Sequence, residues 1–178
     1  MVEQGQDAPR GVPPRFPAGW NMISPLPTIY VFSFGYKFSG PPQDASGNGG
    51  GFVFDCRALP NPFWDPAVRA YSGLEAPVLA WLGREAEVQA YAGHAAELVL
   101  LSARTYRRLG RGRLMAAFGC TGGRHRSPYL ARELAGRLQA EGFAVQLTHL
   151  DVEKEQARFA HERDGAGGGA GHPSQAPH

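Results

Sequence analysis

Residues 114–141, LMAAFGCTGGRHRSPYLARELAGRLQAE, contain three consecutive features that decide the fold. The first six residues, 114–119, carry no charged or polar side chain, which is typical of a strand in a parallel sheet covered on both faces. Residues 127–141 carry apolar side chains at helical spacing, and Pro128 suits the first turn of a helix. The glycine-rich residues 119–127 join the two segments. The stretch therefore predicts a strand, a loop and a helix.

The segments on either side of this unit continue the alternation of strands and helices. Strand character is found in residues 28–34 (TIYVFSF), 52–56 (FVFDC) and 144–149 (AVQLTH), where β-branched and aromatic residues are frequent. Helices are expected at residues 64–70 and over most of residues 76–109, with Gly93 dividing the longer one into two. This order predicts an α/β fold of three layers, a mostly parallel sheet with flanking helices and right-handed crossovers.

Glycine and proline mark where ordered structure is expected to end. The chain has 24 glycines and 15 prolines, and many of them lie in residues 1–27, 41–51 and 165–178. Segments of this composition bury too little apolar surface to fold. We therefore expect a flexible N-terminal arm (1–27), an α/β domain (28–159) with a loop insertion, and a disordered Gly-rich tail (160–178).

Charge and hydropathy narrow the classes of function. The formal net charge is only +2, so the chain lacks the strong positive field of a dedicated nucleic-acid binder. No apolar run approaches the ~20 residues of a membrane span, and residues 1–10 lack the apolar segment of a secretory signal. These features predict a cytoplasmic protein without a membrane partner, in which Cys56 and Cys120 are free thiols.

Residues 119–127, which we call the anion loop, combine the features that bind an oxyanion. The start of a helix presents unpaired backbone N–H groups and the positive end of the helix dipole. Glycines let the backbone approach an anion closely, and arginine can hold a phosphate group through two parallel hydrogen bonds. The candidate ligand-binding residues of the loop are Cys120, Thr121, Gly122, Gly123, Arg124, His125, Arg126 and Ser127. The loop therefore predicts a phosphate-binding site.

Two other interpretations of the anion loop remain open. It could be a tight turn whose glycines serve packing and whose arginines point into water. It also matches Cys-x5-Arg-Ser, the phosphate loop of cysteine-dependent phosphatases, with Cys120 as nucleophile and Arg126 holding the phosphate oxygens. Gly119 stands where those enzymes usually carry histidine, and Asp65 is only a loose candidate for the general acid. We therefore expect binding without catalysis. Neither a cofactor nor a metal is expected, because the remaining histidines show no ligand spacing.

Polar residues that follow the other predicted strands should reach the same edge of the sheet. Ligands of open α/β sheets bind at the carboxyl ends of the strands. Lys37 and Arg57 could bind the anion there, and Asp55 could hydrogen-bond a sugar hydroxyl or amine. Alternatively, Asp55 and Arg57 form a surface ion pair. His149 and Asp151 follow the last strand to the same edge, where a structural role for the histidine is the alternative.

Residues 60–64 (PNPFW) are expected to have an architectural role. Two prolines restrict the backbone on either side of Asn61, which favours a rigid turn. Trp64 is expected to pack beneath this turn and not to contact a ligand.

Four motifs occur in the order in which a known family carries them. They are SFGYK (33–37), FDCRALPNPFW (54–64), GCTGGRHRS (119–127) and HLDVEK (149–154). Together they make residues 29–154 resemble the C-terminal domain of the RapZ family of RNase adapter proteins. Full-length members also carry an N-terminal P-loop kinase-like domain. Because residues 1–178 hold no Gly-x4-Gly-Lys-Ser/Thr motif, we do not expect this domain or its ATP or GTP binding in the sequence.

The resemblance implies a fold similar to a phosphofructokinase subdomain. It also implies a stand-alone sensor or adapter domain for a phosphorylated small molecule. The best-known members sense glucosamine-6-phosphate and bind small RNAs as tetramers, and their sugar-phosphate site is built on a loop that matches residues 120–127. A homo-oligomer and an RNA partner are therefore implied as well.

The residues that would contact RNA differ from the family pattern. Leu150 replaces an arginine of the family's terminal motif, and a segment of mixed charge replaces the basic run that often follows it. A basic cluster remains at Arg104, Arg107, Arg108, Arg111 and Arg113. It could meet phosphates or be a solvated helix end, so an RNA-binding adapter is the third alternative.

Overall fold

The computed structural model describes residues 27–45 and 50–154. Its strands are β1 (Thr28–Gly35), β2 (Phe52–Asp55), β3 (Arg113–Cys120) and β4 (Ala144–His149), and its helices are the 3-10 helix η1 (Pro62–Trp64), α1 (Ala76–Arg84), α2 (Ala86–Arg108) and α3 (Arg126–Ala140). The predicted arm, except for residue 27, and the predicted tail lie outside the described residues. None of the described helices is long and apolar enough to cross a membrane.

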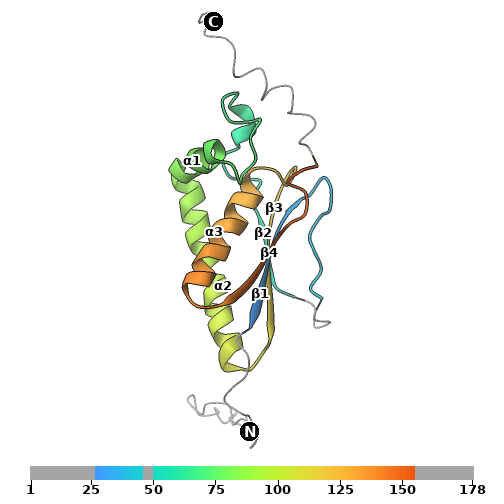
Figure 1. The fold of residues 1–178 in the computed structure, drawn as a ribbon, viewed down its shortest axis with the longest axis vertical. Coiled ribbons are helices and arrows are strands. Elements are labelled where there is room, and N and C mark those ends of the chain that lie inside the picture. The colour runs from blue at the N-terminus through green and yellow to red at the C-terminus, as the bar shows by residue number, and fades with distance from the viewer. Residues whose placement is uncertain (1–26, 46–49, 155–178) are drawn as a thin grey trace, which may run out of the picture.

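The four strands form one parallel sheet in the order β2-β3-β1-β4 (Figure 1). Gly35 at the end of β1 lies beside Cys120 at the end of β3. On the other side of β1, Ser33 lies beside His149 at the end of β4. The carboxyl ends of the strands therefore meet at one edge of the sheet. The predicted α/β fold with a parallel sheet is confirmed.

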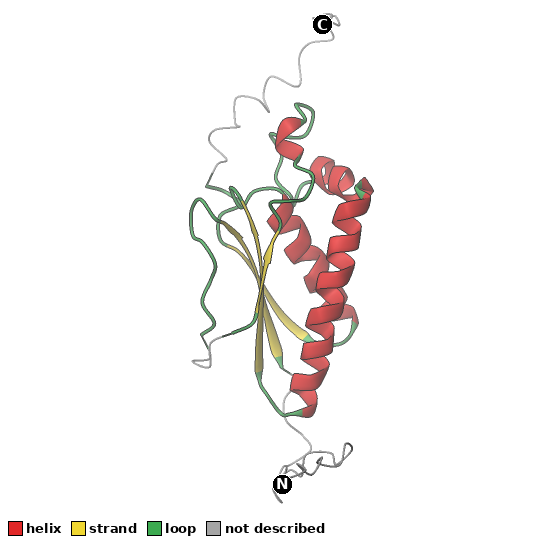
Figure 2. Cartoon of the chain, turned by 180° about the vertical axis from the view of Figure 1, so that it is seen from behind, coloured by secondary structure: helices red, strands yellow, loops and turns green. Residues whose placement is uncertain are grey.

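All three α-helices lie on one side of the sheet, and the segment after β1 passes along the other side (Figures 1 and 2). Right-handed crossovers account for this arrangement. The connections from β2 to β3 and from β3 to β4 run in the same direction across the sheet, so both place their helices on the same face. The connection from β1 to β2 runs in the opposite direction and covers the opposite face. In the described residues 36–45 this layer is a loop, and no helix was expected between these two strands.

The hydrophobic core fills the space between the sheet and the helices. Its central side chains are Ile29 and Val31 of β1, Ala116 and Phe118 of β3, Val99 of α2, and Leu130, Leu134 and Leu138 of α3. The three leucines recur every four residues, which is the spacing that predicted this helix. The sheet and α3 therefore fix the position of the loop that joins them.

Two helix boundaries differ from the expected ones. The long helical segment is divided at Glu85, whose extended backbone (φ −78°, ψ 111°) separates α1 from α2, and Gly93 lies within α2. The helix expected at residues 64–70 is instead η1 followed by turns. Asp65 precedes Pro66 and is extended, as residues before proline usually are, so the helix cannot continue through it.

Candidate anion-binding site

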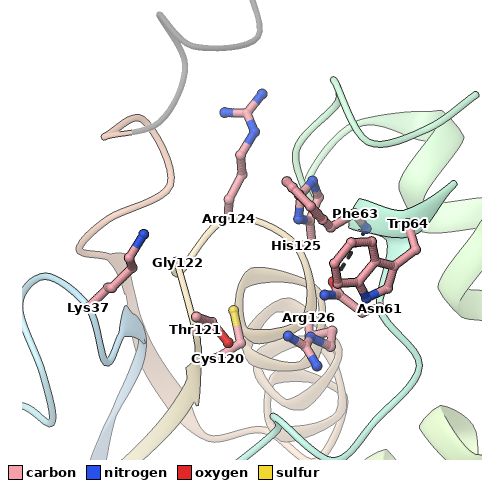
Figure 3. Close-up of a pocket in the computed structure, with 10 residues that line it drawn as sticks. All are labelled: Lys37, Asn61, Phe63, Trp64, Cys120, Thr121, Gly122, Arg124, His125 and Arg126. Atoms are coloured by element: carbon pink, nitrogen blue, oxygen red, sulfur yellow. Dashed lines mark hydrogen bonds between the residues drawn. The ribbon is translucent and has the colours of Figure 1, made fainter. Parts of the chain in front are cut away.

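A cavity of about 250 Å³ opens at the carboxyl edge of the sheet, beside the anion loop (Figure 3). It is lined by Lys37, Asn61, Phe63, Trp64, Cys120, Thr121, Gly122, Arg124, His125 and Arg126. The charged side chains in this lining are all basic, and no carboxylate belongs to it. Within the described ranges, no three potential metal-ligating side chains are grouped together. The lining thus has the character of a site for an anion.

The backbone of β1 continues into the cavity alongside the anion loop. Tyr36 N donates to Cys120 O at 2.9 Å, and Lys37 N donates to Thr121 O at 3.1 Å. Gly123 has φ +71°, and a Cβ atom there would lie 2.7 Å from Gly35 N. The loop and the end of β1 can approach this closely only because glycine has no side chain. This contact places Lys37 next to the loop.

Helix α3 begins at Arg126 with its first turn facing the loop. The preceding residue, His125, provides no side-chain cap, and the first turn contains no acidic residue. The first N–H groups of a helix have no partner within the helix, and they carry the positive end of its dipole. The start of α3 is therefore electropositive.

The guanidinium group of Arg126 connects the anion loop to the segment after β2. Its Nη1 donates to Arg57 O at 2.8 Å and to Leu59 O at 3.0 Å. The residue is only 5% exposed. Its Nε has no hydrogen-bond partner among the described residues. A buried N–H that lacks a partner costs free energy, so this group favours an acceptor from outside the protein.

Arg124 and His125 fix the loop from its other side. Arg124 Nη2 donates to Ala70 O at 2.7 Å, and His125 Nε2 donates to Arg69 O at 3.0 Å. The pKa of His125 is lowered to about 4, mainly by burial and also by the neighbouring arginines, while the hydrogen bond to Arg69 opposes this shift. His125 is therefore neutral at pH 7, and the positive charge of the loop comes from its arginines.

Cys120 and Ser127 form a buried pair beneath the loop. Ser127 Oγ donates to Phe34 O at 3.1 Å and lies 3.1 Å from Cys120 Sγ. A hydroxyl has a single hydrogen. Because Ser127 gives this hydrogen to Phe34, the S–H of Cys120 is the donor between the two. The other cysteine, Cys56, is also a free thiol, and burial raises its pKa well above the usual value.

Asp151, predicted at the site, is buried elsewhere and joins β1 to the segment after β4. Its carboxylate accepts hydrogen bonds from Gly35 N at 2.7 Å and from Ser39 Oγ at 2.6 Å, and it pairs with Lys154 Nζ at 2.6 Å. Burial alone would raise the pKa of Asp151, but these hydrogen bonds bring it below the usual value. Asp151 is not part of the cavity lining.

Three other predicted residues are also directed to protein partners. His149 Nδ1 lies 2.7 Å from Ser33 Oγ, and burial lowers its pKa. Asp55 and Arg57 form an exposed ion pair of 2.6 Å, the alternative expected from the sequence. A side-chain hydrogen bond from Arg57 lowers the pKa of Asp55. None of the three lines the cavity.

Residues 61–64, which we call the aromatic turn, provide one wall of the cavity. The sequence analysis did not place them at the site. Trp64 was expected to pack beneath this turn, but its side chain is 78% exposed. Figure 3 places Trp64 and Asn61 on the right of the cavity and Lys37 on the left. The turn follows a strand end by a few residues, and strand ends meet at the site. This position could have indicated from the sequence that the turn lies beside the cavity.

The fold and the site define an α/β domain with a parallel sheet and a glycine-rich basic loop at the start of a helix. Residues 27–153 match the family described as the RapZ C-terminal domain, and the chain belongs to this family.

Several relatives carry the name "Nucleotide-binding protein". The one from Laribacter hongkongensis is 44% identical over 126 residues, which are 71% of this chain and 43% of the relative. The relative from Saccharopolyspora erythraea is 41% identical over 128 residues, which are 71% of this chain and 42% of the relative. The one from Thermotoga neapolitana is 38% identical over 127 residues, which are 71% of this chain and 43% of the relative. The chain thus spans about two fifths of the length of these relatives.

Proposed function

We propose that this domain is a sensor or adapter domain that binds a phosphorylated small molecule in the anion loop. The ligand class that we infer is a sugar phosphate, with an amino sugar phosphate such as glucosamine-6-phosphate as the first candidate. The relatives' name, nucleotide-binding protein, agrees with a phosphorylated ligand. The two free thiols fit a reducing compartment, so we place this function in the cytoplasm.

The observation that carries the proposal is Arg126. Its buried Nε lacks a partner within residues 27–45 and 50–154, and Arg126 is one of the residues that line the cavity. The uncapped start of α3 adds backbone N–H groups and a favourable dipole at the same place. A phosphate oxygen would supply the missing acceptor, and Lys37 lies across the cavity to add a second positive charge (Figure 3).

The size and lining of the cavity support a small polar ligand. About 250 Å³ is slightly below the range of pockets for drug-sized molecules. The ammonium group of an amino sugar would meet no carboxylate in this lining, because Asp55 and Asp151 are paired elsewhere. The aromatic face of Trp64 and backbone carbonyls remain to receive it.

Substitution of Arg126 tests the proposal. Isothermal titration calorimetry with glucosamine-6-phosphate, glucose-6-phosphate and inorganic phosphate should show about 100-fold weaker binding or none for Arg126→Ala. Arg126→Lys should recover only part of the affinity, because lysine lacks the planar fork of donors. Arg132→Ala, on the exposed face of the same helix, is the matched control and should bind as the wild type does. Equal affinity in Arg126→Ala would refute the assignment of this residue.

A cysteine-dependent phosphatase is the second candidate, favoured by the position of Cys120 in the cavity lining. Two contacts speak for binding without turnover. Cys120 donates its S–H to Ser127, and Asp65, the loose candidate for the general acid, accepts from Trp81 Nε1 at 3.0 Å and does not line the cavity. We expect no release of phosphate from an aryl phosphate above background. Steady release that Cys120→Ser abolishes would establish the phosphatase instead.

RNA binding is the third candidate, and its basis is the basic cluster that runs from the end of α2 to the start of β3. Most of these arginines already have partners in the described structure. Arg104 pairs with Glu141 and Arg113 with Asp44, while Arg107 lies over the ring of Phe143. We expect only weak, salt-sensitive RNA binding that falls when Arg107, Arg108 and Arg111 are changed together to serine. Nanomolar, sequence-selective binding at about 150 mM salt would promote the RNA adapter.

A homo-oligomer is the remaining part of the proposal. Leu98 and Leu101 lie one turn apart on α2 and are 51% and 65% exposed. Two large apolar side chains on one helix face favour contact with another protein surface. Sedimentation of the wild type should show an assembly larger than the monomer, which Leu101→Lys should dissociate.

A further inference from the structure

Trp64 is the most exposed of the large apolar side chains in the described structure, at 78%. Tryptophan is highly buried on average in folded proteins. Phe63 beside it lies with its ring centroid 5.0 Å away in an edge-to-face arrangement, so the two rings form one aromatic surface. Both residues line the cavity. An exposed indole at the rim of a basic cavity suggests contact with a ligand.

The aromatic turn is held rigidly, although Trp64 itself is exposed. Asn61 Oδ1 accepts from Phe63 N at 3.3 Å and caps the turn at its start. Asp65 N donates to Pro62 O at 3.0 Å at its end. The carboxylate of Asp65 in turn accepts from Trp81 Nε1 of α1 at 3.0 Å. The backbone that carries Trp64 is therefore fixed without help from the indole.

The same turn is tied to the anion loop through Arg126. The Nη1 bonds of Arg126 to Arg57 O and Leu59 O hold the segment that leads into the turn. Arg126 thus positions the aromatic turn through its Nη1 and is itself one of the residues that line the cavity, while its buried Nε has no partner among the described residues. The distance between the anion position and the indole is set by the protein before any ligand binds, which lowers the cost of binding a ligand of matching length.

We propose that Trp64 determines the specificity of the site for its ligand. The ligand is a phosphate monoester of a ring-containing molecule, whose phosphate group lies in the anion loop and whose ring stacks on the indole of Trp64. This inference rests on the proposed function and adds to it the residue that recognises the ring of the ligand. A flat, weakly polar ring face suits an indole, whether the ring is a pyranose or a nucleobase. Asn61, whose Oδ1 is used by Phe63, can donate from Nδ2 to a ring hydroxyl or base acceptor.

The test compares phosphates with and without a ring in calorimetric titrations of the full chain. Glucose-6-phosphate and adenosine monophosphate carry rings, while glycerol-3-phosphate and inorganic phosphate carry none. Trp64→Ala should weaken binding of at least one ring-bearing ligand about tenfold, as loss of a stacked aromatic does. Its affinity for the two ringless ligands should stay within about twofold. Trp64→Phe should retain most of the affinity.

Phe38→Ala is the matched control, since Phe38 is another exposed aromatic, is not part of the cavity lining, and should affect no ligand. The ring ligand with the larger loss identifies the occupant as a sugar or a nucleobase. An equal loss for ringless and ring-bearing ligands would overturn the proposal, because Trp64 would then only shape the turn. No loss for any ligand would overturn it as well. A wild type that binds none of the four, or an Arg126→Ala variant that binds all, would refute the proposed function instead.

Discussion

The ends of β3 and β4 lie at the same edge of one sheet and are both followed by charged residues, yet these charged groups are used differently. After β4, the carboxylate of Asp151 is buried and accepts from Gly35, Ser39 and Lys154. After β3, the buried Nε of Arg126 has no partner in the described part of the chain, and Arg126 is one of the residues that line a cavity. The first region is complete within the protein, and the second is completed by a ligand under our proposal.

This difference shows that a position at the carboxyl edge of a parallel sheet does not by itself make a residue part of a site. β4 is an edge strand, and its end is closed by the segment 150–154 and the turn after β1. β3 has neighbours on both sides, and its end continues into a helix whose first turn is uncapped. Unsatisfied backbone and side-chain donors therefore accumulate after β3.

The largest effect is expected where the protein completes its own interactions. Asp151→Ala removes a buried carboxylate, leaves the buried Gly35 N–H without its acceptor and takes the ion-pair partner from Lys154. We expect the free energy of unfolding to fall by about 3–5 kcal/mol, because several hydrogen bonds to a charged group are lost at about 1.5–3 kcal/mol each. Denaturant unfolding measures this loss. Asp55→Ala, which removes an exposed carboxylate, is the control and should change the midpoint little.

The contribution of Asp151 should also depend on pH. Its pKa is lowered in the folded state, so the stabilisation is present above the unfolded pKa of about 4 and is lost as the pH falls through the folded value. The difference in unfolding free energy between the wild type and Asp151→Ala should therefore shrink below about pH 4. A difference that stays constant would show that the charge contributes nothing.

The fold and the anion loop were predictable because both depend on local patterns. Apolar residues 114–119, helical spacing after Pro128 and four motifs in order predicted the α/β class, the parallel sheet and the family, and all three are confirmed. The composition of the anion loop predicted that its basic side chains would gather at one place. Seven of the candidate ligand-binding residues named from the sequence line the cavity: Lys37, Cys120, Thr121, Gly122, Arg124, His125 and Arg126.

The side-chain partners could not be predicted because they depend on contacts between distant segments. Asp151 and Gly35 are 116 residues apart, and no sequence pattern signals their hydrogen bond. The turn that carries Trp64 is held by a hydrogen bond from Trp81 Nε1 of α1 to Asp65, 16 residues away in the sequence. The division at Glu85 depends on how α1 and α2 pack and not on the helix propensity of Gly93.

A second prediction uses the contact between the two regions. A Cβ atom on Gly123 would lie 2.7 Å from Gly35 N and 2.8 Å from Asp151 Cβ, and the φ of +71° disfavours alanine in any case. Gly123→Ala should lower the free energy of unfolding by about 2–3 kcal/mol. It should also weaken phosphate binding, because the loop must move.

The matched control for this variant is Gly136→Ala in α3. No atom lies within 4 Å of the added Cβ there, and alanine favours a helix more than glycine does. This control should be as stable as the wild type or more stable by up to about 1 kcal/mol. Equal stability of Gly123→Ala and Gly136→Ala in thermal unfolding would contradict the close approach of the two regions.

A third prediction concerns the proton balance of the anion loop. The pKa of His125 is about 4 in the folded state and about 6.5 in the unfolded state, so the unfolded state binds more protons between these values. Stability should therefore fall as the pH is lowered from about 6.5 to 4, by about 3 kcal/mol from this residue. His125→Gln should remove this part of the pH dependence in denaturant titrations. Parallel curves for the two proteins would show that His125 titrates normally.

The smallest effect is expected from the residue that the sequence placed at the site and the structure places outside it. Arg57 pairs with Asp55 at 2.6 Å and lies over the ring of Tyr36 at 4.1 Å, and its side chain is about half exposed. Its backbone carbonyl, and not its guanidinium, serves the site by accepting from Arg126. Arg57→Ala keeps that carbonyl, so phosphate affinity should change less than about twofold, whereas Arg126→Ala should lose it. A large loss of affinity in Arg57→Ala, with an unchanged melting temperature, would mean that its guanidinium turns toward the ligand on binding. The binding region would then include the guanidinium of Arg57 after β2 as well as the residues after β3.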